Sequence, residues 1–199
     1  MFIIELYNKY KKYLYEILFC FILCGIIGWI WETSYVLIMF GHLTDRGILF
    51  ISRINGFPII WGLPFILMYG VGGALMIWGF KPLAKKPVLL FFICMFSMTA
   101  FEYLTSFVYE QLRNQLLWDY SNNFMNFQGR ICLSSAIAWG VLGIVSVKLF
   151  GPLFHRLYLK VEQVKVIHLI IILLVVYIVF CYSVRSVLFP EMVNQLQLN

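Results

Sequence analysis

Five long apolar runs constrain the fold of this chain more than any other feature of its sequence. They cover approximately residues 15–40, 57–80, 87–109, 131–154 and 166–189. A helix needs about 20 mainly apolar residues to cross the hydrocarbon core of a bilayer, and each run is long enough. The chain is 62% hydrophobic and 12% charged, whereas soluble domains are about 45–50% apolar and about 25% charged. The sequence therefore predicts an all-α integral membrane bundle of about five transmembrane helices, forming a single membrane domain over residues 1–199.

Basic residues between the runs predict the orientation of this bundle. Loops on the cytoplasmic side of a membrane carry an excess of Lys and Arg. On one side lie Lys9, Lys11, Lys12, Lys81, Lys85, Lys86, Lys148, Arg156, Lys160 and Lys165. On the other side lie Arg46, Arg53, Arg113, Arg130 and Arg185. The first side holds the N-terminus, which is therefore expected in the cytoplasm.

Ionisable residues inside or beside the apolar runs point to a polar site. Glu102 lies in the middle of the third run, Glu32 near the end of the first, and Arg130 just before the fourth. A charged side chain at the bilayer centre costs about 3 kcal/mol on insertion scales, so such residues usually face a bundle interior. In the predicted orientation the outer half of the bundle holds Glu32, Asp45, Arg46, Glu102, Asp119 and Arg130.

The surroundings of Glu102 allow two interpretations. Thr99, Glu102 and Ser106 are spaced to share one helix face, and Tyr109 continues that face. This polar face either lines a cavity or forms a seam of interhelical hydrogen bonds in which Glu102 is neutral. A lone carboxyl is a costly way to build a seam, which favours the cavity.

Glycines and prolines predict how the helices pack and bend. Gly25 and Gly28 share a face of the first run with Glu32 and would let a neighbour approach closely. Ala136, Gly140 and Gly143 form a similar seam in the fourth run. Pro64 lies inside the second run, where it predicts a kink or a broken first turn.

The connections on the predicted outer side are polar and aromatic. Asp119 is expected either to pair with Arg130 or to cap a short helix. Arg46 and Arg53 are seven residues apart and would share the face of an interfacial helix.

Several classes of function have no support in the sequence. No Ser/His/Asp set, HExxH motif or close acid pair is present, so no catalytic residue, metal ligand or cofactor is predicted. No GxxxxGK[ST] motif is present, so the chain cannot be its own P-loop ATPase. The five cysteines lie in or beside apolar runs and are expected to be free packing residues. The net charge of +6 reflects membrane topology and does not predict nucleic-acid binding.

An ordered set of short motifs resembles a known family. The motifs are Gly28-Trp29-Ile30-Trp31-Glu32-Thr33-Ser34-Tyr35, Asp45-Arg46-Gly47-Ile48-Leu49, Gly62-x-Pro64 followed by Tyr69-Gly70-x-Gly72, Phe101-Glu102-Tyr103-Leu104-Thr105-Ser106, Trp118-Asp119-Tyr120-Ser121, Asn126 to Leu133, and Trp139-Gly140-x-x-Gly143. Over about residues 15–155 the chain is similar to the bacterial ABC-transporter type IV family, whose members are described as ABC transporter permeases. About a dozen residues, Phe50 to Trp61, depart from the family pattern. The resemblance implies a multi-pass protein of the bacterial plasma membrane.

The leading hypothesis is a transporter permease subunit with a substrate-binding site in its outer half. Its core would be Glu32, Glu102 and Arg130, and its lid would be Asp45, Arg46, Asp119 and Tyr120. Membrane lipids are expected partners. A true ABC component would need a separate ATPase subunit, and five spans suit a homodimer better than a lone pore. The alternatives are an intramembrane or lipid-modifying enzyme, in which Glu102 is the acid or base, and a regulatory or scaffold membrane protein.

Overall fold

The computed structural model describes residues 2–41, 50–54, 57–114 and 116–188, and it confirms the predicted all-α class. The helices are α1 (Phe2–Phe40), α2 (Leu67–Ala74), α3 (Pro87–Arg113), α4 (Leu133–Val145), α5 (Gly151–Val161) and α6 (Ile167–Leu188). The short π-helical turns η1 (Leu75–Gly79) and η3 (Ser146–Phe150) continue α2 and α4, and η2 (Lys81–Leu83) is a 3-10 turn. The strands are β1 (Phe50–Ile54) and β2 (Phe57–Trp61).

Four helical segments in the described part of the chain are long and apolar enough to cross a membrane. They are Tyr10–Met39, Pro87–Leu112, Leu133–Val161 and Ile167–Val184. The third of these combines α4, η3 and α5 into one continuous helical run. The prediction of a helix over 57–80 is wrong in its first part, because the helix there covers only Leu67–Gly79 and begins after Pro64.

An antiparallel hairpin replaces the start of that expected span. Its register pairs Phe50 with Trp61 and Ile54 with Phe57. Arg53 therefore lies in a strand, so the expected helix face shared by Arg46 and Arg53 is wrong for Arg53. Arg46 lies outside the described residues.

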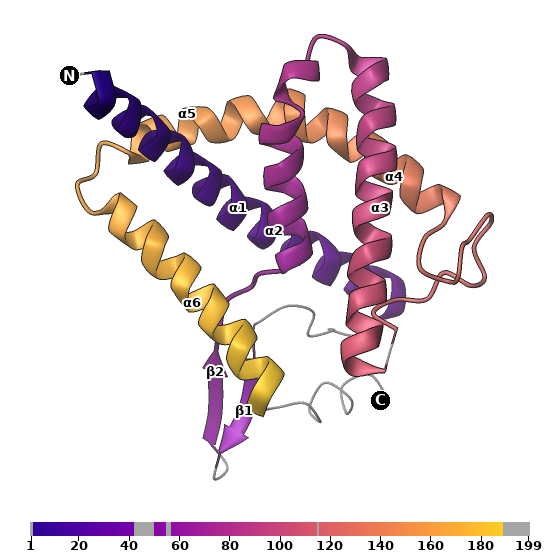
Figure 1. The fold of residues 1–199 in the computed structure, drawn as a ribbon. Coiled ribbons are helices and arrows are strands. Elements are labelled where there is room, and N and C mark those ends of the chain that lie inside the picture. Colours follow the sequence, from indigo (N-terminus) through magenta and orange to yellow (C-terminus); the bar gives the residue numbers. More distant parts are fainter. Residues whose placement is uncertain (1, 42–49, 55–56, 115, 189–199) are drawn as a thin grey trace. The chain divides into compact units, whose positions relative to one another are not determined.

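The chain divides into two compact units. The first unit comprises Met1–Gly73 and Leu157–Asn199, and in it α1 packs against α6 (Figure 1). The core of this unit contains Tyr15, Ile22, Phe65, Tyr158, Ile171, Ile178 and Cys181. A Cβ atom added at Gly25 would strike the Phe65 ring, and one at Gly28 would strike Tyr69. The predicted close approach at these two glycines is therefore confirmed.

The second unit comprises Ala74–Arg156 and is built on the packing of α3 against α4. A Cβ atom at Gly140 would meet the Phe91 ring, and one at Gly143 would meet the side chain of Cys94. The predicted small-residue seam is thus used where α3 and α4 touch. Turns η1 and η3 are also in contact within this unit.

Candidate functional site

The polar face of α3 is turned toward α4. Glu102 is 2% exposed and Ser106 is fully buried, while Thr99 is half-buried. The shared face predicted from the spacing of these residues is confirmed. The apolar neighbours on the opposite side of α3, such as Phe96 and Leu104, are exposed.

Both carboxylate oxygens of Glu102 accept hydrogen bonds from neutral donors. The Trp139 indole N–H on α4 donates to Oε2 at 3.0 Å. The Tyr120 hydroxyl donates to Oε1 at 3.2 Å. Within the described residues, no Lys, Arg or His forms an ion pair with this carboxyl. Among the residues that the structure describes, neutral hydrogen-bond donors therefore hold this carboxyl and no positive charge compensates it.

The hydroxyls on either side of Glu102 keep unused hydrogen-bonding capacity. Thr99 Oγ1 and Ser106 Oγ are buried and have no hydrogen-bond partner among the described residues. Burial of a hydroxyl without a partner costs about 1–3 kcal/mol on protein mutational scales. The polar face of α3 can therefore bind a polar group through these two hydroxyls while the hydrogen bonds to Glu102 stay in place.

The loop from Leu116 to Cys132 places Tyr120 on Glu102. Its own hydrogen bonds shape it: the Tyr120 N–H donates to the Gly129 carbonyl at 2.8 Å, and the Trp118 indole N–H donates to the Arg130 carbonyl at 2.8 Å. Gly129 has a φ of 65°, and a Cβ atom there would lie 2.8 Å from Ser121 Oγ. Only glycine adopts this positive φ without strain and also lacks the Cβ atom that would meet Ser121.

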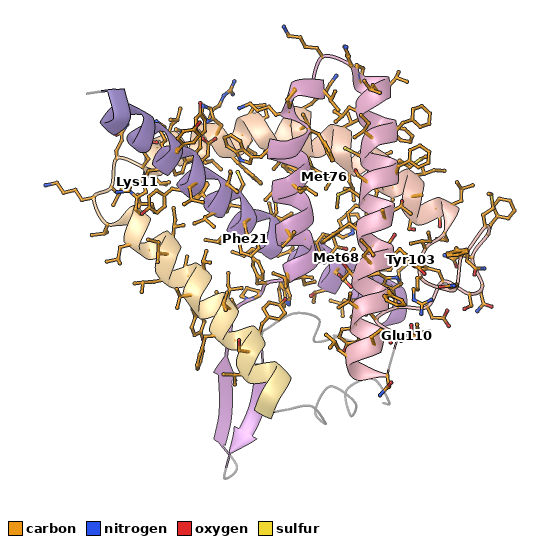
Figure 2. The ribbon with its side chains drawn as sticks, in the orientation of Figure 1. Lys11, Phe21, Met68, Met76, Tyr103 and Glu110 are labelled. Carbon is orange, nitrogen blue, oxygen red and sulfur yellow. The ribbon has the colours of Figure 1, made fainter. Side chains whose placement is uncertain are left out.

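Arg130 closes this loop against α3. It forms an ion pair with Glu110 and donates to Gln128 Oε1 at 2.6 Å. Its guanidinium lies 5.8 Å from the centroids of the Tyr103 and Phe107 rings, within cation–π range. Figure 2 shows Tyr103 and Glu110 along α3, with Tyr103 beside the loop.

Asp119 has a local role that differs from the two expected ones. Its Oδ1 accepts hydrogen bonds from the Ser121 hydroxyl at 2.5 Å and from the Ser121 backbone N–H at 2.8 Å. These two bonds, the hydroxyl first, lower the pKa of Asp119 below its ordinary value. Because Arg130 pairs with Glu110 instead, the expected pair between Asp119 and Arg130 is not formed.

The predicted site residues thus fall into three groups. Glu102 and Tyr120 are in direct contact, and Asp119 and Arg130 belong to the same loop. Glu32 is a half-buried residue of α1, in the other compact unit. Asp45 and Arg46 lie outside the described residues.

A family model matches residues 19–184, which is most of the chain. That family is described as "Putative ABC-transporter type IV". The chain belongs to this family. No curated protein and no solved structure matches the chain.

Membership of the type IV family confirms the resemblance drawn from the motifs, and four apolar helices fit a membrane protein. The sequence of this type IV family member nevertheless did not predict two contact residues, Trp139 and Glu110. Trp139 was visible only as part of the Trp-Gly-x-x-Gly motif, and Glu110 only as the acid at the end of the third run. Nothing in the spacing of these residues reveals which side chains they meet.

Proposed function

We propose that the chain is the membrane-embedded permease subunit of a transporter in the bacterial plasma membrane, with Glu102 at the centre of its substrate site. The observation that carries the proposal is a carboxyl buried within an apolar span and hydrogen-bonded only by neutral donors among the described residues. Intramembrane acids are costly and usually serve binding or transport. Family membership points in the same direction.

In the proposed site, a substrate presents a cationic or protic group to Glu102. The hydroxyls of Thr99 and Ser106 supply further hydrogen-bonding capacity on the same face. The loop with Asp119, Tyr120 and Arg130 acts as the lid, because Tyr120 on this loop is hydrogen-bonded to Oε1 of Glu102.

The energy source of the proposed transporter is a separate ATPase subunit. The sequence holds no GxxxxGK[ST] motif with which to bind nucleotide phosphates. A homodimer of this chain would supply enough helices to enclose a pathway.

The test is gentle purification of the tagged chain from its native membrane, followed by native mass spectrometry and identification of co-purified small molecules. We expect a stoichiometric subunit with a Walker A motif and a polar small molecule. Glu102→Gln should keep that subunit and lose the small molecule, whereas the control Glu162→Gln should keep both. Absence of a nucleotide-binding subunit would contradict the permease, and equal retention of the molecule by Glu102→Gln would contradict the site.

A scaffold role for Glu102 is the second candidate, and one specific observation favours it. Both carboxylate oxygens are bonded, so the residue ties α3 to α4 through Trp139 and to the loop through Tyr120. If this is its whole purpose, Glu102→Gln should lower stability by about 1–3 kcal/mol, the cost of leaving a buried hydrogen-bonding group without its partner. A loss below about 1 kcal/mol together with lost ligand binding would favour the transport site.

A further inference from the structure

A second polar cluster lies in the first compact unit, away from Glu102. A cavity of about 190 Å³ is lined by Lys11, Lys12, Tyr15, Tyr158, Glu162 and His168. These residues come from the first part of α1, the end of α5 with the turn that follows it, and the start of α6. Figure 2 shows Lys11 near the N-terminal end of α1. This end of the helix lies near the connection between α5 and α6. Since one water occupies about 30 Å³ of liquid, the cavity has room for a group much larger than a water molecule.

The cavity presents donors suited to a phosphate. Lys11 is exposed and forms no ion pair with any of the described residues, so its ammonium is available. The Tyr158 hydroxyl and His168 Nε2 lie 3.3 Å apart and form a hydrogen bond, and the Tyr15 and His168 rings are 4.1 Å apart between centroids. This packing holds the imidazole and the phenol at the cavity wall.

Two acids limit the positive charge of the cluster. Glu162 lines the cavity and forms an ion pair of 2.8 Å with Lys12. Glu16 is also close by: it is 3% exposed on α1 and acts electrostatically on Tyr158. A bound anion must therefore share the Lys12 ammonium with Glu162. Lys11 can bind the anion without first losing an ion pair.

The depth of the cavity matches the headgroup layer of a bilayer. The apolar segment of α1 begins at Tyr10, that of α5 ends at Val161, and that of α6 begins at Ile167. The cavity lies where these three segments end, and Lys11 and Lys12 are among the residues that line it. Leu14 and Leu169 adjoin the lining residues Tyr15 and His168 in sequence, and their exposed side chains offer a surface for an acyl chain. A basic pocket between helix ends at this level is suited to an anionic headgroup.

We propose that this cavity binds the phosphate of an anionic phospholipid, with Lys11 as the main cationic contact and Lys12 as the second. His168 and Tyr158 position the phosphate from the cavity wall. Free inorganic phosphate has the same chemistry and is the competing source. The lipid is favoured because exposed apolar side chains, Leu14 and Leu169, adjoin lining residues in sequence and a free ion would not use them.

The test is native mass spectrometry of the full chain in detergent, titrated separately with phosphatidylglycerol, phosphatidylcholine and inorganic phosphate. We expect phosphatidylglycerol to bind more tightly than phosphatidylcholine. Lys11→Gln should weaken phosphatidylglycerol binding about fivefold, which corresponds to about 1 kcal/mol for one basic residue near an anionic surface. The control Lys85→Gln removes the same charge from an exposed position outside the cavity and should leave binding unchanged.

Glu162→Gln gives a test in the opposite direction. It removes the competitor of the bound phosphate for Lys12 and should tighten phosphatidylglycerol binding, a gain that misfolding would not produce. Equal affinities for Lys11→Gln and Lys85→Gln, or weaker binding by Glu162→Gln, would overturn the site. Inorganic phosphate that displaces phosphatidylglycerol at equal concentration would overturn the lipid as its ligand.

Discussion

The Trp139 indole N–H donates a hydrogen bond to Glu102 across the α3–α4 contact, with 3.0 Å between nitrogen and oxygen. This bond is buried, because Glu102 is 2% exposed and Trp139 is 6% exposed. It links the only acid in the middle of the third apolar run to the small-residue seam of α4, on which Gly140 and Gly143 also lie. The position of the acid is thus fixed by the same contact that packs the two helices.

Replacing Trp139 tests the strength of this bond. Trp139→Phe removes the donor while keeping an aromatic ring, and it should lower the free energy of unfolding by about 1 kcal/mol, the typical scale of interhelical hydrogen bonds in membranes. The measurement is thermal or steric-trap unfolding in detergent. The control Trp31→Phe changes a tryptophan that is 68% exposed and should have little effect. Equal losses in the two variants would show that the Trp139 bond contributes nothing.

The ion pair between Arg130 and Glu110 should contribute more than a surface pair. The Arg130 side chain is 11% exposed and that of Glu110 is 32% exposed. Exposed pairs are worth about 0.2–1 kcal/mol and breaking a buried pair costs about 3–5 kcal/mol, so Arg130→Gln should cost about 1–3 kcal/mol.

A double-mutant cycle measures that coupling. Arg130→Gln combined with Glu110→Gln should cost less than the sum of the single changes, because neither charge is then left without its partner. The exposed Arg156→Gln serves as the control. Additive losses would contradict a direct coupling between Arg130 and Glu110.

Gly143 should not accept a side chain. A Cβ atom there would meet the Cys94 side chain on α3, so Gly143→Ala should cost about 1–3 kcal/mol through overpacking. Gly79→Ala is the matched control, since the nearest atom to its Cβ would be Leu75 Cδ1 at 3.9 Å. The measurement compares the unfolding midpoints of the two variants. If Gly143→Ala is as stable as Gly79→Ala, the tight α3–α4 contact is contradicted.

The loop should depend on pH through Asp119. The Ser121 hydroxyl and N–H lower the pKa of this carboxyl below its ordinary value of 3.8. A lowered pKa in the folded state means that charged Asp119 stabilises the loop above that ordinary value, and that this contribution is lost as the pH falls through the folded pKa. Wild type should therefore be more stable than Asp119→Asn at pH 7, and the difference should shrink as the pH falls through the lowered pKa of Asp119. A difference that stays constant as the solution is acidified would contradict the assignment.

Cysteine labelling tests the orientation on which the outer-half site depends. Asn122→Cys, in a background without the five native cysteines, should react with an impermeant maleimide in intact cells, because Asn122 is exposed in the loop before α4. Lys85→Cys, on the predicted cytoplasmic side, should react only after permeabilisation. The reverse pattern would invert the predicted topology.

Helical spacing predicted what lies within one helix. Thr99, Glu102 and Ser106 were expected on one face, and the structure turns that face toward α4. Gly28 and Gly143 were expected at close contacts and lie there. Such predictions succeed because the period of a helix fixes which residues share a face.

Contacts between segments could not be predicted in the same way. Asp119 was expected either to pair with Arg130 or to cap a short helix, but Arg130 pairs with Glu110, because the choice of partner depends on how the loop folds back on α3. The segment from Phe50 to Trp61, which departs from the family pattern, was expected to begin a helix near residue 57 and forms strands β1 and β2 instead. The sequence does hold a hairpin signal there, the dipeptide Asn55-Gly56 between two apolar stretches. The long apolar run from residue 57 obscured it.

The two π-helical turns have a consequence for how this chain compares with its relatives. A π turn closes its hydrogen bond over five residues, whereas an α turn closes over four, so each turn holds one additional residue. Relatives that lack such a turn should align with this chain only if a one-residue gap is opened within Leu75–Gly79 or Ser146–Phe150. Because η1 and η3 touch each other, relatives should have either both inserted residues or neither.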